Sequence, residues 1–477
     1  MYYKNSTFAL ENDTTRLMDP IIHYFSYMDK AIRSNWNAPA LTDYKGAVSY
    51  TYGEMAQEIV RLKTFLASAG IQPGDKIAIV GRNCSHWALA YLAIAAYRGV
   101  AVTILPDWEA SHIEVFLKHS DAKMLFASAA VLGRLNLKNL KAVKTVVTLD
   151  DWSVIQSPIS NLQLPPNNHQ SPISDLEFPT KNLDDLALIH YATDDIEHPK
   201  GIMLTHSSIS SNVMFGEESI PGGPEKNVLS LLPLSQMLGL VFDCLYPLAG
   251  GSHIWFVTKP LSTDQLYEAF GVVKPFMFFT IPHLVEKIVH RMTDPLFKTV
   301  VDKILWWLPI LGLKRRRQAR KQLMQALGGQ LDILVVGDGK LDRAIERRLK
   351  QMHFPYTCGY GIAECAPLLS YEYPKQFAFG SVGKVVDRME IAIASKHYHR
   401  VPGEILVRGD NVMLGYYRDM QATNAVFTDD GWMRTGDIGV KDRQGNLYLV
   451  GKNTISMISV EDEEDYFNPR AAANSIK

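Results

Sequence analysis

The 477-residue sequence has few cysteines and no strong excess of charge of either sign. Its four cysteines form no CxxC pair, and it contains neither an HExxH motif nor a cluster of Cys and His. Disulfide frameworks and zinc sites depend on such spacings, so we expect reduced thiols and no structural zinc. Lys and Arg number 49 against 50 Asp and Glu, a formal net charge of −1. A balanced chain makes nucleic acid a poor candidate partner.

Long hydrophobic runs are also missing. The most apolar stretch, residues 304–313, contains Pro309 and is half the length of about 20 residues that a membrane-spanning helix needs. The amino terminus lacks the basic start and apolar core of a signal peptide. These absences predict a cytoplasmic protein, with at most a peripheral contact to a membrane.

Ordinary globular composition is present, with 47% hydrophobic and 21% charged residues. At about 150 residues per domain, the length predicts roughly three core-forming units. Helical spacing over residues 51–70, 86–97 and from 111 alternates with apolar runs at 76–81 and 100–106. This alternation predicts an α/β lobe with a mostly parallel sheet.

Composition changes along the chain predict four regions. The first α/β lobe covers 1–180 and ends in a linker rich in Pro, Ser and Asn; a second α/β lobe covers 181–373. Short strands separated by turns predict a small antiparallel β-barrel over 374–450, followed by a hinge and tail over 451–477. The predicted fold class is therefore two doubly wound α/β lobes with mixed sheets plus the barrel.

One stretch, residues 188–210, is typical of a phosphate site. It has an apolar strand, a loop that ends in Pro199, Lys200 and Gly201, and a predicted helix opened by Thr205 or Ser207. Backbone N–H groups at a helix start favour anions, although such a loop alone is more often an ordinary turn. Further motifs follow in order: LLPLSQMLG (231–239), VVGDG (335–339), GYGIAE (359–364), RGDNVMLGYY (408–417) and GWMRTGD (431–437).

The ordered motifs resemble the adenylate-forming superfamily, which includes acyl-CoA synthetases, peptide-synthetase adenylation domains and firefly luciferase. The resemblance covers roughly residues 25–452, and the apolar-then-basic insert at 302–329 is most similar to bacterial long-chain fatty acyl-CoA ligases. It implies the large amino-terminal domain of that fold. It also implies ATP-dependent adenylation of a fatty or other carboxylate and transfer of the acyl group to CoA, with ATP/AMP, Mg²⁺ and CoA as cofactors.

The resemblance also implies roles for residues. Tyr360 would stack on adenine and Asp437 would bind the ribose hydroxyls. The other implied nucleotide positions are Thr193, Gly337, Gly339, Gly361 and Ala363. The implied catalytic residues are Lys200 at a phosphate, Glu364 as the Mg²⁺ ligand, and Lys452 where the family usually has a ribose-binding Arg.

The phosphate loop departs from the family pattern. Asp194, Asp195, Ile196 and Glu197 replace its glycines and hydroxyl residues. A carboxylate about 4 Å from a phosphate oxygen costs on the order of 4 kcal/mol at an effective dielectric constant of 20. Ala363 also replaces a threonine of the family motif. We therefore expect impaired adenylation.

Two hypotheses stay open. The resemblance implies a small mobile domain after the hinge, and we expect this sequence to lack most of it. The chain is either a working acyl-activating enzyme, with that domain supplied by a separate chain, or a non-catalytic relative that binds an acyl chain, a nucleotide or a protein. A second pair of alternatives concerns residues 304–321, which are either an ordinary packed helix with a basic end or a contact to a membrane surface.

Overall fold

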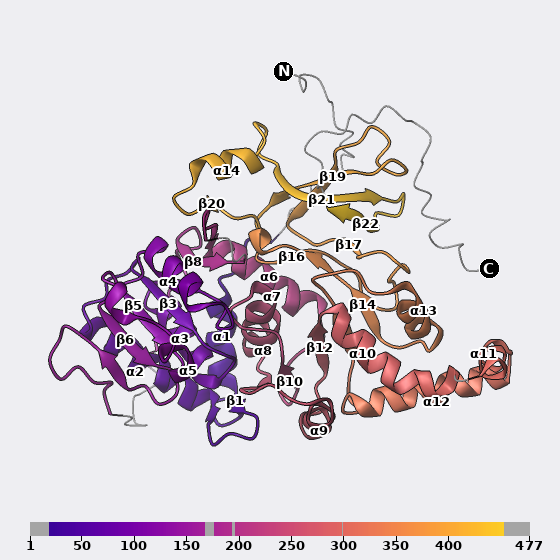
Figure 1. Cartoon of the computed structure of the whole chain (residues 1–477), viewed down its shortest axis with the longest axis horizontal. Coiled ribbons are helices and arrows are strands. Elements are labelled where there is room, and N and C mark those ends of the chain that lie inside the picture. The colour runs from indigo at the N-terminus through magenta and orange to yellow at the C-terminus, as the bar shows by residue number, and fades with distance from the viewer. Residues whose placement is uncertain (1–18, 167–175, 193–195, 298, 453–477) are drawn as a thin grey trace.

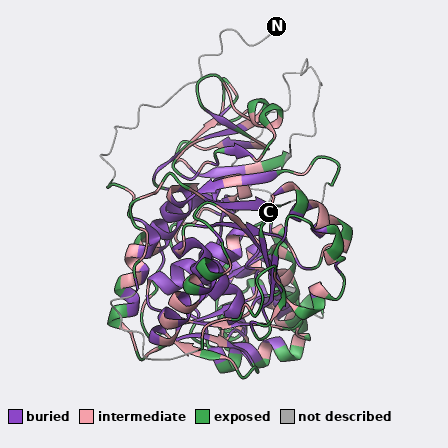
Figure 2. Ribbon diagram, turned by 90° about the vertical axis from the view of Figure 1, so that its left-hand side faces the viewer, coloured by how far each residue is buried: buried purple, intermediate pink, exposed green. Residues whose placement is uncertain are grey.

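The computed structural model describes residues 19–166, 176–192, 196–297 and 299–452. Two large sheets lie side by side, and a smaller antiparallel layer covers one edge of both (Figure 1). Buried residues fill the interior between these layers and the helices around them, as Figure 2 shows. The structure confirms the predicted α/β class with mixed sheets and an antiparallel β subdomain.

The first sheet has eight strands in the order β20-β9-β8-β4-β3-β5-β6-β7. Strands β3, β4, β5, β6 and β8 are parallel, while β7, β9 and β20 pair antiparallel. Their bounds are β3 (Lys76–Val80), β4 (Val100–Thr103), β5 (Met124–Ala127), β6 (Thr145–Thr148), β7 (Val154–Gln156), β8 (Leu186–Tyr191), β9 (Gly201–Thr205) and β20 (Gly415–Tyr416).

The second sheet has seven strands in the order β14-β13-β12-β10-β11-β1-β2, of which only β2 pairs antiparallel. Their bounds are β1 (Pro39–Asp43), β2 (Ser49–Thr51), β10 (Asn227–Ser230), β11 (His253–Phe256), β12 (Met277–Thr280), β13 (Ile333–Val336) and β14 (Tyr356–Cys358). Strands from both sides of residue 180 therefore occur in each sheet. The division at this residue stays a prediction.

Helices surround both sheets. They are α1 (Tyr24–Ser34), α2 (Tyr52–Ser68), α3 (Ser85–Ala96), α4 (Ala110–His119), α5 (Ala129–Leu132), α6 (His206–Ser219), α7 (Met237–Leu240), α8 (Tyr246–Ala249), α9 (Thr263–Val273), α10 (Pro282–Thr293), α11 (Val300–Trp307), α12 (Leu311–Ala326), α13 (Arg343–Gln351) and α14 (Met420–Val426). Every residue of α3 is buried because this helix packs between α2 and strands of both sheets. That position explains why its sequence has no polar face.

The antiparallel layer consists of two small sheets. One is a curled four-stranded sheet of β18 (Met389–Ile393), β19 (Gly403–Gly409), β21 (Met433–Lys441) and β22 (Leu447–Lys452). The other contains β15 (Tyr360–Gly361), β16 (Leu368–Tyr371) and β17 (Lys384–Val385). No helix in the described part of the chain combines the length and apolar character needed to cross a membrane.

The structure confirms the predicted helix start at Thr205, which caps α6. The sequence analysis missed the strand before it, because residues 201–205 form β9. Antiparallel pairing joins Tyr191 to Gly201 and Leu186 to Thr205, so β8 and β9 form a hairpin. The apolar side chains of this short strand pack into the sheet, and helix α6 begins after Thr205.

Candidate functional site

Tyr360 and Asp437 form the first pair of the candidate site. Tyr360 follows β14 and is 6% exposed, while Asp437 lies half-buried on β21. The Tyr360 hydroxyl donates a hydrogen bond of 2.7 Å to Oδ2 of Asp437. Burial raises the pKa of Tyr360, and the nearby Asp437 carboxylate raises it further. The phenol therefore stays protonated at neutral pH and holds the carboxylate of β21 in place by its hydrogen bond.

Glu364 and Tyr416 form a second pair. Glu364 lies in the short 3₁₀ helix η5 (Ala363–Cys365), and its backbone carbonyl accepts a bond of 2.8 Å from the Met413 N–H. The Tyr416 hydroxyl donates to Oε1 of Glu364 over 3.0 Å. Burial raises the pKa of Tyr416, and the Glu364 carboxylate adds to this shift.

Lys200 extends this second pair. Its Nζ lies 5.5 Å from the centroid of the Tyr416 ring, within reach of a cation–π contact. Pairing of β20 with β9, with Tyr416 opposite Ile202, brings the two residues together. The exposed ammonium of Lys200, the ring of Tyr416 and the carboxylate of Glu364 therefore lie in a row. The ammonium can bind a phosphate, and the carboxylate can bind a cation.

A glycine turn follows β13. The buried Gly337 donates its N–H to the Thr280 carbonyl over 2.9 Å, and the exposed Gly339 has a φ of +148°. A Cβ at Gly337 would meet Leu238 at 3.2 Å, and one at Gly339 would meet Pro282 at 3.1 Å. Small residues therefore keep the backbone of this turn open to a flat ligand.

Gly361 has a different reason for being glycine. A Cβ at this position would lie 2.2 Å from the Pro367 carbonyl oxygen, which no substitution could accommodate without a backbone shift. Backbone packing accounts for this residue without any ligand.

The structure thus brings Tyr360 next to Asp437. Glu364 and Lys200 both contact Tyr416, which lies between them. Ala363 is half-buried at the start of η5, and the backbone of Lys452 pairs with Asp437. Thr193 lies outside the described residues. Tyr416 belongs to the motif at 408–417, where no role was expected for this tyrosine.

The hairpin of β8 and β9 changes the electrostatic argument for the phosphate loop. The connection between the two strands leaves from Tyr191 and returns at Gly201, whereas α6 begins at the opposite end of β9. Thr205 caps α6 there, accepting a bond of 3.1 Å from the Ser208 N–H. The dipole of α6 therefore does not serve this loop, and an anion would depend on Lys200 and backbone N–H groups.

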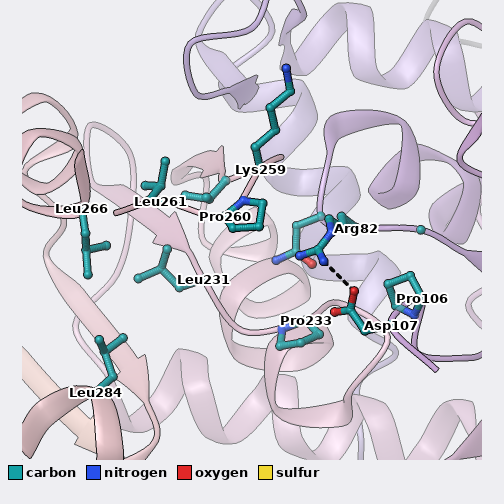
Figure 3. Close-up of a pocket in the computed structure, with 13 residues that line it drawn as sticks. Arg82, Pro106, Asp107, Leu231, Pro233, Lys259, Pro260, Leu261, Leu266 and Leu284 are labelled. Carbon is teal, nitrogen blue, oxygen red and sulfur yellow. Dashed lines mark hydrogen bonds and ion pairs between the residues drawn. The ribbon is translucent and has the colours of Figure 1, made fainter. Parts of the chain in front are cut away.

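A cavity of about 300 Å³ opens where the carboxyl ends of the two sheets meet (Figure 3). Arg82 and Asp107, which follow β3 and β4, form an ion pair of 2.5 Å at its edge. Leucines that follow β10 and β11 or belong to α9 and α10 form an apolar wall: Leu231, Leu261, Leu266 and Leu284. Lys259 adds a second cation to the lining.

Asn83 fixes the two sheets across this cavity. It is 7% exposed, and its Nδ2 donates to the Leu232 carbonyl over 2.7 Å. Its Oδ1 accepts from the Leu234 N–H over 2.8 Å. The loop after β3 is therefore bonded to the loop after β10. The sequence did not indicate this cavity: Leu231 and Pro233 belong to the motif at 231–239, but the rest of the lining comes from five other turns and helices.

Comparison with known proteins gives the family context. Residues 28–417 match the AMP-binding enzyme family. Long-chain-fatty-acid–CoA ligase 5 of Rattus norvegicus is 25% identical, with 91% of this chain aligned to 70% of that protein. Fatty acyl-CoA synthetase A of Dictyostelium discoideum is 26% identical, and the match covers 81% of this chain but only 62% of that protein, less than two thirds of its length.

Solved structures show the same fold. A long-chain-fatty-acid-CoA ligase (FadD1) from Archaeoglobus fulgidus superposes with a TM-score of 0.72 at 16% identity, covering 93% of this chain and 87% of that one. The inhibitor-bound N-terminal domain of FACL13 from Mycobacterium tuberculosis gives a TM-score of 0.72 at 18% identity, covering 90% of this chain and all of that domain. At these identities the likeness concerns the fold.

Proposed function

Because this chain belongs to the AMP-binding enzyme family, we propose that it binds an adenine nucleotide and a fatty carboxylate, and that its acidic loop weakens adenylation. The observation that carries the proposal is a pair of tyrosine–carboxylate hydrogen bonds, Tyr360 with Asp437 and Tyr416 with Glu364, the second of which lies beside Lys200. In this proposal the chain descends from acyl-CoA ligases that join the acyl group to CoA.

The nucleoside would bind at Asp437 and Tyr360. A half-buried carboxylate on a rigid strand is suited to accept hydrogen bonds from two ribose hydroxyls. The Tyr360 ring, fixed through its hydroxyl, offers a flat face for adenine, and the turn at Gly337 and Gly339 leaves room for the base.

The phosphates would bind between Lys200 and Glu364. Glu364 would contribute a carboxylate ligand; among the described residues no three acidic, His or Cys side chains converge on a metal site. This fits Mg²⁺, which is commonly held by one or two carboxylates together with substrate phosphates and water. When bound, the ion would screen the phosphate charge; Tyr416 would orient Glu364 toward it.

The cavity between the sheets would take the hydrocarbon part of the carboxylate substrate. Its leucine wall suits an alkyl chain, with about 0.8 kcal/mol gained for each buried methylene. Helix α10 links this wall to the nucleotide turn, because Leu284 lines the cavity and Pro282 lies against Gly339. The substrate carboxylate would therefore approach the nucleotide from this side.

A non-catalytic relative is the second candidate. The observation that favours it is Ala363, which lacks the hydroxyl of the family motif and lies directly before Glu364. The acidic residues 194, 195 and 197 act in the same direction. The proposal has three further parts. A separate chain would supply the family's mobile domain, the protein would be cytoplasmic, and residues 304–321 would make a peripheral membrane contact.

Pyrophosphate release tests the proposal. The protein is incubated with ATP, Mg²⁺ and fatty acids of graded chain length, beside a variant that carries D194G, D195T, I196T and E197G. We expect little release from the natural chain and more from the variant, because three negative charges leave the loop. Adding K200A to the variant should remove the gain. Rapid release from the natural chain would refute the impairment, and no gain in the folded variant would favour the non-catalytic relative.

A further inference from the structure

Helices α11 and α12 form a hairpin that projects from the end of the second sheet (Figure 1). The corner where the two helices meet is well anchored. Trp306 is 1% exposed, its Nε1 donates to Oε1 of Gln351 over 2.6 Å, and its ring lies 4.7 Å from that of Phe297. A Cβ at Gly312 would lie 2.2 Å from the Trp306 carbonyl oxygen, so the two helices meet at a close-packed corner.

The outer side of this hairpin is apolar and faces solvent. The described residues include 18 exposed large hydrophobic side chains, and eight of them lie between residues 300 and 313. They are Val300, Val301, Ile304, Trp307, Leu308, Ile310, Leu311 and Leu313. Trp307 is 60% exposed and Ile310 is 74% exposed.

The spacing of these residues is that of an amphipathic helix turned outward. Val300, Ile304 and Trp307 lie on one face of α11, the face that a surface helix normally packs against the core. Here Trp306 makes the core contact and the apolar stripe points away from it. Soluble proteins rarely expose such a contiguous patch unless it binds something apolar.

Positive charge adjoins the apolar side. Residues 299–321 contain seven basic residues and one acidic residue, in a protein with a net charge of −1. The acidic residue, Asp302, is paired with Arg315 at 2.9 Å. Basic side chains that remain exposed on α12 are Lys314, Arg317, Arg320 and Lys321.

We propose that the hairpin of α11 and α12 docks this protein on an anionic lipid bilayer. Ile304, Trp307 and Ile310 would enter the interface between headgroups and acyl chains, and the cations of α12 would contact anionic headgroups. A second copy of the chain fits poorly, because two basic hairpins would repel each other. The proposal does not depend on adenylation.

Sedimentation of the whole protein with vesicles tests this proposal. The vesicles are phosphatidylcholine alone or phosphatidylcholine mixed with phosphatidylserine, an anionic lipid of the cytoplasmic leaflet. We expect binding to anionic vesicles that weakens as salt is added. R317Q/R320Q/K321Q should lower the affinity about a hundredfold, about fivefold for each charge removed. I304E/W307E should abolish binding.

Matched controls separate this surface from general effects. K138Q/K141Q/K144Q removes three exposed lysines near β6, at the other end of the molecule, and I155E places a charge at an exposed isoleucine of β7. Both should bind vesicles like the natural chain, and thermal unfolding confirms that all variants fold. Equal binding by the hairpin variants, or no binding by the natural chain at low salt, would overturn the proposal. A third outcome would instead assign the hairpin to an acidic protein: soluble polyglutamate displaces the vesicles, and I304E/W307E leaves vesicle binding unchanged.

Discussion

Individual hydrogen bonds connect distant parts of the chain at the candidate site. Tyr360 and Asp437 are 77 residues apart, and Glu364 and Tyr416 are 52 residues apart. Each bond joins the segment that follows β14 to a strand of a different sheet, Tyr360 to β21 and Glu364 to β20. The carboxylates are thus held by buried phenols before any ligand binds, which reduces the cost of ordering them around a nucleotide.

Two substitutions of Tyr360 distinguish the contribution of its ring to AMP binding from that of its hydroxyl. We expect Tyr360→Ala to weaken AMP binding about tenfold or more, because stacking of a base on an aromatic ring contributes about 1–3 kcal/mol. Tyr360→Phe keeps the ring and should stay within about threefold of the natural chain. Calorimetric titration with AMP measures both.

Tyr448→Phe is the matched control. Tyr448 lies on the neighbouring strand β22, and its hydroxyl donates a hydrogen bond of 3.2 Å to Asp442. The substitution removes this similar tyrosine–aspartate bond. AMP affinity should not change in this variant. Natural affinity in Tyr360→Ala would show that the ring does not contact the base.

At the scale of elements, α1 packs against α6 through two histidines. His23 precedes α1 and His206 begins α6; their ring centroids are 4.9 Å apart and both are buried. Burial lowers the pKa of His23 to about 3, helped by His206, and that of His206 to about 4. Near His206, the Asp185 carboxylate opposes this shift and Arg98 supports it.

Acid should therefore loosen this contact. Both histidines are neutral in the folded protein but take up protons below about pH 6.5 when unfolded, so their contribution to stability is complete above that pH and falls toward pH 4. We expect His206→Gln to reduce the pH dependence of the unfolding free energy by about 1.4 kcal/mol per pH unit between pH 6 and 4.5. Urea unfolding measures it. The exposed His397→Gln should keep the natural slope, and an unchanged slope in His206→Gln would contradict the explanation.

The elements also show what the sequence could predict. Apolar runs predicted β3, β4 and β8 correctly, because strands buried on both faces need such runs. Strand β9 was missed because its five residues lie directly before a good helix cap at Thr205. The site motifs could be recognised, but the bonds made by Tyr416 and Asn83 depend on the tertiary fold.

At the scale of the whole molecule, the two sheets exchange strands. β1 and β2 come from the amino-terminal part and complete the second sheet, while β8 and β9 come after residue 180 and complete the first. We therefore expect residues 19–180 and 181–452, produced separately, to lack cooperative unfolding, because each would leave apolar strand edges unpaired.

Circular dichroism during thermal unfolding measures whether each separate piece unfolds cooperatively. The two pieces produced together by co-expression are the control. Co-expressed pieces should associate and unfold cooperatively, since Asn83 and the shared strands can then reform their contacts. Cooperative unfolding of residues 19–180 alone would show that the first sheet does not need β8 and β9.

We propose that this chain keeps a nucleotide site whose phosphate side is opposed by its own acidic loop. Calorimetric comparison of AMP with Mg²⁺–ATP tests it most directly, because only ATP carries the β- and γ-phosphates. We predict that the natural chain binds AMP more tightly than Mg²⁺–ATP, and that D194G/D195T/I196T/E197G improves ATP affinity about tenfold or more while leaving AMP unchanged. Asp437→Ala should weaken both nucleotides. Tighter binding of ATP than AMP by the natural chain, with no gain in the loop variant, would contradict the account.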